Sequence, residues 1–129
     1  DLTPEMRLAI KTKTVFTDQM RDVFFKRLIS KIQDLGSKIQ NLIVAQTFIK
    51  EKYRVNLLKK IPKTKFILVE TKKEIREKRL LQRAYYPLDL EYARIMEKNF
   101  EKPKIDHLVI INNVDDVKNI KKQVAKLIL

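Results

Sequence analysis

The sequence predicts an α/β fold, a partial doubly wound parallel sheet with flanking helices. Three short apolar runs rich in β-branched residues lie at 41–45, 65–70 and 107–112, and we interpret them as strands. None of them alternates between apolar and polar residues, which is the pattern of strands covered on both faces. Longer segments with the apolar spacing of helices separate the runs. Strands joined through helices run parallel, so we expect a parallel sheet.

The first predicted helix precedes the first strand. Asp18 can cap its amino end, and it runs to about Leu35, where Gly36 closes it. One stripe of its surface is apolar and carries Met20, Val23, Phe24, Leu28, Ile32 and Leu35. The second predicted helix follows the strand at 41–45. Thr47 can cap this helix, which we expect to end before Pro62.

Two more helices are expected between the second and third strands. Thr71 and Glu74 have the spacing of a capping box and predict a helix that Pro87 interrupts. A further helix is expected over 88–100, and Pro103 stops it.

A terminal helix should follow the third strand, with Asn113 as its cap. In open parallel sheets, ligands bind beyond the carboxyl ends of the strands. Here those ends are 46–47, 70–71 and 112–113, and we expect a binding site there.

Length and composition indicate one globular domain, 1–129, of which 44% is hydrophobic and 35% charged. No apolar run approaches the ~20 residues that span a bilayer, so we expect a cytoplasmic protein without a membrane partner. The chain has no cysteine, and His107 is its only histidine, which excludes disulfides, thiolate metal sites and two-histidine mechanisms. Neither Ser30 nor Ser37 lies in a nucleophile-elbow motif, which sets aside hydrolase triads.

The formal net charge of +13 has two interpretations. Clustered Lys and Arg can bind nucleic acid by releasing counterions from its phosphates. However, the basic residues are scattered through every segment and comprise 21 Lys and 8 Arg, which is also typical of codon bias in an AT-rich genome.

Basic residues gather after the first predicted strand. Thr47, Lys50 and Arg54 lie in the first turns of the second predicted helix, and Lys50 and Arg54 share a face because they are four residues apart. Together they could hold a carboxylate or a phosphate. The alternative is a solvated basic helix face.

Several motifs, taken in order, resemble the gluconate kinases and the related shikimate kinases. The segment AQTFIKEKYR at 45–54 resembles a gluconate kinase signature, and 75–83 is similar to the arginine-bearing lid of both families. Residues 100–103 (FEKP) resemble the Leu-Glu-x-Pro after that lid, and 2–7 (LTPEMR) resemble the substrate-side segment. The resemblance implies a P-loop NTPase-like kinase fold that uses ATP and Mg²⁺, with a helical lid at 72–103.

The resemblance also implies roles for particular residues. It implies that Arg7, Thr47, Lys50 and Arg54 bind the substrate. It also implies that Arg83 and Arg79 take part in catalysis, and that Arg79, Arg83 and Asn113 bind the nucleotide. Independently, a mobile arginine can stabilise the charge of a transferring phosphoryl group. Alternatively, Arg76, Arg79 and Arg83 are solvent-facing partners of acids such as Glu74 and Glu77.

The chain departs from the family at two places. A phosphate loop needs several glycines, and Gly36 is the only glycine here, so the fold is expected to lack its first strand and that loop. Either the sequence is part of a longer kinase, which the start at Asp1 favours, or it is a remnant without transfer chemistry. Ala84, Tyr85 and Tyr86 stand where gluconate kinases carry Gly-His-Phe, which leaves the phosphoryl acceptor open.

Two functions follow from these observations. The first is an ATP-dependent phosphotransferase acting on a small hydroxylated, anionic metabolite, with the nucleotide and that substrate as partners. The second is a catalytically inactive basic binding module for nucleic acid or a protein partner.

Overall fold

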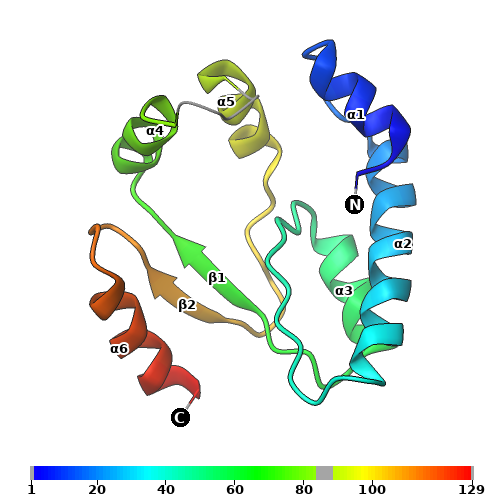
Figure 1. Cartoon of the computed structure of the whole chain (residues 1–129), viewed down its shortest axis with the longest axis vertical. Coiled ribbons are helices and arrows are strands. Elements are labelled where there is room, and N and C mark those ends of the chain that lie inside the picture. Colours follow the sequence, from blue (N-terminus) through cyan, green and yellow to red (C-terminus); the bar gives the residue numbers. More distant parts are fainter. Residues whose placement is uncertain (1, 84–88, 129) are drawn as a thin grey trace.

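The computed structural model describes residues 2–83 and 89–128 and is of mixed α/β type (Figure 1). In chain order the elements are α1 (Pro4–Lys11), α2 (Asp18–Gly36), α3 (Glu51–Lys60), β1 (Ile67–Glu70), α4 (Lys73–Leu81), α5 (Leu90–Asn99), β2 (Leu108–Ile111) and α6 (Val117–Ile128). Within these ranges, no helix is both long and apolar enough to cross a membrane.

The two strands pair in parallel, with Ile67 opposite Leu108 and Glu70 opposite Ile111. This confirms the parallel arrangement predicted for the second and third runs. The prediction of a strand at 41–45 is wrong, because residues 42–49 form neither helix nor strand. A strand requires a neighbour that exchanges backbone hydrogen bonds with it. Within the described residues, β1 and β2 pair with each other and no strand lies against this segment.

Helix α1 was not predicted, although its start is marked in the sequence. The Thr3 hydroxyl accepts a hydrogen bond from the Met6 N–H, and Pro4 occupies the first helical position. Met6 and Ala9 are buried, so α1 contributes to the core.

Two predicted amino-terminal caps are corrected in the first half of the chain. Thr17, not Asp18, caps α2, since its hydroxyl accepts from the Met20 N–H. Helix α3 begins at Glu51, so Thr47 does not cap it. The physical reason is that the chain stays extended at Lys50, with φ −122° and ψ 147°, before the helix turns.

Two further predicted caps are also wrong. Helix α4 begins at Lys73 without a side-chain cap, so Thr71 and Glu74 form no capping box. Helix α6 begins at Val117, four residues after Asn113. The Asn113 Oδ1 instead accepts from the Lys72 N–H at 2.8 Å and thus joins the carboxyl ends of β1 and β2. Asp89 caps α5, and the predicted break at Pro87 lies outside the described residues.

The core is formed mainly by helices, with Ile49 from the irregular segment and Ile110 from β2 also buried. One cluster comprises Met6, Phe24, Phe25, Ile49 and Tyr53, and a second comprises Ile29, Ile32 and Leu57. The rings of Phe25 and Tyr53 stack with centroids 4.0 Å apart, which fixes α2 on α3. No residue of β1 is buried. The sheet therefore stands beside the helical core with much of its apolar surface uncovered.

Candidate functional site

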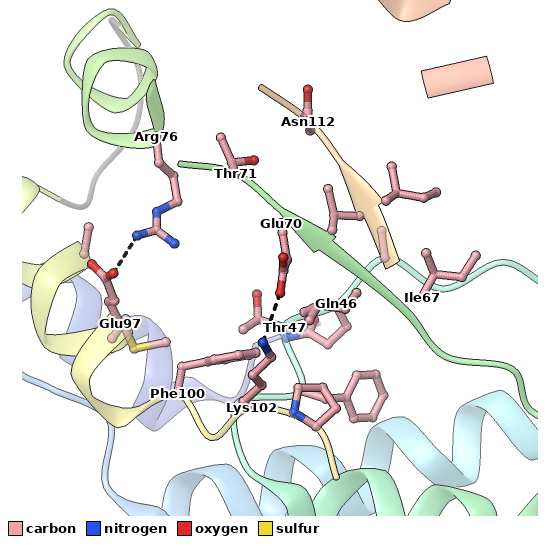
Figure 2. Close-up of a pocket in the computed structure, with 18 of the residues that line it drawn as sticks. Gln46, Thr47, Ile67, Glu70, Thr71, Arg76, Glu97, Phe100, Lys102 and Asn112 are labelled. Atoms are coloured by element: carbon pink, nitrogen blue, oxygen red, sulfur yellow. Dashed lines mark hydrogen bonds and ion pairs between the residues drawn. The ribbon is translucent and has the colours of Figure 1, made fainter. Parts of the chain in front are cut away.

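A cavity of about 1210 Å³ lies beside the sheet. Its walls are the irregular segment 44–48, the strand β1, and the helices α4 and α5. Figure 2 shows Glu70 and Thr71 at the carboxyl end of β1, with Gln46 and Thr47 across from them. The cavity thus lies at the sheet edge where parallel strands place ligands.

Among the charged residues of the cavity lining, cations outnumber acids. Seven Lys and Arg residues line it against three Glu residues, which leaves a formal surplus of four positive charges. The cations are Arg54, Lys72, Arg76, Arg79, Arg83, Arg94 and Lys102, and the acids are Glu70, Glu77 and Glu97. Such a surplus favours an anionic ligand.

Five of the seven predicted site residues line this one cavity, namely Thr47, Arg54, Arg79, Arg83 and Asn113. They come from four different parts of the chain. Arg7 and Lys50 are not in the lining. Arg7 is exposed on α1 and donates to the carbonyl of Leu2, and the Lys50 ammonium lies 3.1 Å from an Asp18 carboxylate oxygen.

Arg54 is held by groups of the protein itself. Its side chain is 2% exposed and donates to the Glu51 carboxylate and to the carbonyl oxygens of Phe48 and Glu101. The guanidinium also lies over the Phe100 ring, 5.3 Å from its centroid. Arg54 therefore ties α3 to the segments before α3 and after α5.

The amino end of α3 already holds a carboxylate. The Glu51 N–H donates to Glu101 Oε2 at 2.8 Å. Free N–H groups at a helix amino end attract anions, and here the neighbouring chain supplies the anion. An anionic substrate would have to displace Glu101 to reach this helix end.

The α4 arginines are ordered by partners on other elements. Arg79 donates to the Asn112 carbonyl at 2.9 Å and approaches Asp115 to 2.7 Å, so it links α4 to the end of β2. Arg76 lies 2.7 Å from Glu97 on α5 (Figure 2). These contacts place both guanidinium groups on the cavity wall.

A second ion pair connects α4 with α5. The Arg94 Nε donates to the Glu77 carboxylate at 3.0 Å. This hydrogen bond holds the pKa of Glu77 below its usual value and raises that of Arg94. Arg83 also lines the cavity, near the carboxyl end of α4.

Sequence reasoning did not assign Lys72, Glu101 or Lys102 to the site. Lys72 and Lys102 line the cavity, and the Lys102 ammonium lies 3.5 Å from Glu70. The FEKP motif at 100–103 was a sequence signal for Glu101 and Lys102. Glu101 accepts a hydrogen bond at the amino end of α3, and Lys102 pairs with Glu70 across the cavity.

The described residues contain no group of three His, Cys, Asp or Glu side chains that could hold a metal ion. Magnesium in phosphotransferases is often held by one or two carboxylates together with the substrate phosphates, so a dedicated protein cage is not required. Glu70 is the carboxylate nearest the carboxyl end of β1.

Searches against protein-family models, curated proteins and solved structures find no significant match to this chain.

Proposed function

We propose that this chain forms part of an ATP-dependent phosphotransferase that acts on a small hydroxylated, anionic metabolite. The supporting observation is that five residues predicted for substrate or nucleotide binding line a single cationic cavity. That cavity opens at the carboxyl edge of a parallel strand pair. Nucleotide and substrate would both bring negative charge to this place.

In this proposal Arg79 and Arg83 bind the nucleotide phosphates. During transfer the γ-phosphoryl group spreads negative charge over its oxygens, and positioned guanidinium groups stabilise that charge. Arg79 is preorganised for this task by Asp115 and the Asn112 carbonyl. A phosphate group would take over the Arg79 hydrogen bond that the exposed Asp115 now accepts.

Thr47 and Asn113 contribute neutral polar groups to the cavity, and Arg54 acts by holding the segment that carries Thr47. A glycine-rich phosphate loop is needed as well, and these 129 residues contain one glycine. We therefore place that loop, and the Mg²⁺ ligands, on polypeptide other than these residues.

The test is a titration of the protein with a fluorescent ATP analogue and Mg²⁺. Arg79→Ala combined with Arg83→Ala should weaken binding by about tenfold or more, since a hydrogen bond to a charged group contributes about 1.5–3 kcal/mol. Lys38→Ala is the matched control, because Lys38 pairs with Asp34 on α2 and does not line the cavity. Equal binding of the ATP analogue by the parent, the double variant and Lys38→Ala would overturn the proposal.

The net charge of +13 favours a second candidate, the basic module that binds nucleic acid. The same protein should then bind a duplex or single-stranded oligonucleotide with an affinity that falls steeply with salt. ATP should compete poorly with the oligonucleotide. Tight, salt-insensitive binding of ATP would exclude this alternative.

A further inference from the structure

Most cations of the cavity lining are already paired with acids of the same chain. The guanidinium groups of Arg76, Arg79 and Arg94 each lie within 3.0 Å of a carboxylate oxygen. The Lys102 ammonium lies 3.5 Å from Glu70. An incoming anion must therefore displace or share a carboxylate of the protein at each of these four groups.

Lys72 differs from the other cations of the lining. Within residues 2–83 and 89–128, its ammonium makes no hydrogen bond and no ion pair, although the residue is exposed and lines the same cavity. Arg54 is enclosed by internal acceptors, and Arg83 is engaged as well. Lys72 is thus the cation of the described lining that an anion can reach without displacing a group of the protein.

The main chain of Lys72 is held from both sides. Its N–H donates to Asn113 Oδ1 at 2.8 Å, and its carbonyl accepts from the Arg76 N–H at 3.0 Å. A residue whose main chain is already fixed loses less freedom when its side chain binds a ligand. The structure therefore combines a fixed attachment point with a free ammonium.

Lys72 lies at the edge where both strands end. The Asn112 N–H donates to the Glu70 carbonyl at 2.8 Å, and Figure 2 shows Asn112 near Thr71, the residue before Lys72. Arg79 donates to the Asn112 carbonyl, so Lys72 and Arg79 contact adjacent residues of the segment after β2. Parallel sheets place ligands at this edge.

We infer that Lys72 is a further binding residue of the cavity and holds a phosphate group. The inference deepens the proposed function and rests on it for the source of that group, the nucleotide. A lysine ammonium recognises phosphate as a point charge, whereas planar, bidentate recognition of carboxylates favours arginine.

A phosphate chain held at Lys72 lies beside Asn112 and Asn113, and so within the neighbourhood of Arg79. There it can replace the Asp115 carboxylate, which is 88% exposed and solvated. Lys72 supplies the contact that costs no internal ion pair, and Arg79 supplies the contact that does. The two residues then bind the same chain of phosphates from the two strand ends.

The test is an NMR titration of the full chain with inorganic tripolyphosphate, which carries the phosphate chain of a nucleotide without its base or sugar. A salt concentration of about 0.15 M screens charge effects beyond about 8 Å. Amide shifts of Lys72 and Asn113 report the binding, and dissociation constants in the millimolar range are accessible. Citrate, a polycarboxylate, is titrated in parallel and should bind more weakly.

Lys72→Ala should weaken tripolyphosphate binding by about five- to tenfold, the range for an exposed ion pair or a hydrogen bond to a charged group. Lys73→Ala is the matched control, because it removes the same charge one residue away and Lys73 does not line the cavity. It should change the affinity by less than about twofold. Lys72→Arg keeps the positive charge and should retain most of the affinity.

Four results would overturn the inference. They are equal losses in Lys72→Ala and Lys73→Ala, unchanged affinity in Lys72→Ala, no amide shift on addition of tripolyphosphate, and tighter binding of citrate than of tripolyphosphate. The first would mean that only net charge matters, and the last would assign Lys72 to a carboxylate.

The proposed function fails by a different measurement, the ATP-analogue titration of the Arg79→Ala, Arg83→Ala double variant. If that variant binds the analogue as the parent does while Lys72→Ala loses tripolyphosphate, the phosphate site stands without the phosphotransferase. If the double variant loses the analogue and Lys72→Ala keeps tripolyphosphate, the role of Lys72 is refuted and the proposed function stands.

Discussion

Arg54 is the charged residue on which the packing between α3 and the 100–105 segment depends. It is 2% exposed, and its guanidinium donates to the Glu51 carboxylate and to the carbonyl oxygens of Phe48 and Glu101. Removing one partner of a buried ion pair leaves the other unpaired, which costs about 3–5 kcal/mol. We expect Arg54→Ala to lower the free energy of unfolding by about 3 kcal/mol or more, measured by urea denaturation.

Arg54→Lys tests whether the fork of the guanidinium matters, since a lysine cannot reach several acceptors in one plane. It should recover only part of the loss. Lys38→Ala, which breaks a well exposed pair, should cost less than about 1 kcal/mol. A neutral effect of Arg54→Ala on stability, together with loss of substrate binding, would instead favour the purely substrate-binding role.

Glu51 predicts how stability changes in acid. Burial by itself would raise its pKa, but hydrogen bonds from Arg54 and from the N–H groups of Ile105 and Lys104 outweigh burial and hold the pKa below the ordinary 4.5. A carboxyl whose pKa is lower in the folded state contributes stability that is present above the unfolded pKa and lost as the pH falls through the folded pKa.

The unfolding free energy should therefore decline as the pH falls below about 4.5, and Glu51→Gln should make that decline shallower. Urea denaturation over a pH series measures both. Glu74→Gln serves as the control, because it removes one carboxylate without breaking a side-chain hydrogen bond in the described structure. Identical acid slopes for the parent and Glu51→Gln would contradict the assignment.

Helix α6 is hydrogen-bonded to the edge of β2 through the amide of Gln123. Gln123 makes two hydrogen bonds to Ile111 and a third to Asn119 at 2.7 Å. Gln123→Met keeps the size of the side chain but leaves the backbone groups of Ile111 unpaired. We expect faster hydrogen exchange of the Ile111 amide and a loss of roughly 0.5–1.5 kcal/mol in unfolding free energy per hydrogen bond.

Gln82→Met is the matched control, because Gln82 follows α4 and its side chain makes no hydrogen bond within the described part of the chain. It should leave exchange at Ile111 unchanged. Equal exchange at Ile111 in Gln123→Met and the parent would mean that water replaces the amide at no cost.

Helix starts illustrate how elements depend on their surroundings. The sequences that follow Thr47 and Thr71 are typical of a helix start, yet neither threonine caps a helix. A threonine caps a helix only when the backbone turns directly after it. At Thr47 the chain continues as the cavity wall, and at Thr71 it continues to Lys72, whose N–H is bound by Asn113.

For the whole molecule, the large exposed surface predicts a weak dependence of stability on denaturant. An unfolded chain of this mass exposes about 22,300 Å², so folding to 10048 Å² buries about one-fifth less area than folding to a compact protein. Since the urea m-value scales with the area exposed on unfolding, it should be about one-fifth lower than is usual for 129 residues.

Small-angle scattering provides an independent measure of the same property. A compact chain of this length has a radius of gyration of about 14 Å, and we expect a larger value. A radius near 14 Å with an ordinary m-value would mean that the surface is covered in solution.

The sequence by itself determined the α/β class and the parallel order of the second and third runs. Of the seven residues that the resemblance suggested for a site, five line the cavity, and their roles stay predictions. These properties are local or follow from chain order, because apolar periodicity selects helices and strands, and parallel strands bring their carboxyl ends together. Polar residues placed directly after strands must then meet at one edge.

Only the tertiary structure decided which of these groups are engaged and which strand forms. Arg54 hydrogen-bonds to acceptors of the protein itself, Glu101 accepts from the amino end of α3, and Asn113 joins two strand ends. The run at 41–45 has the composition of a strand but stays irregular. The physical reason is common to all four: a hydrogen-bonding group is satisfied by whichever partner the fold brings within reach, and a strand exists only beside another strand.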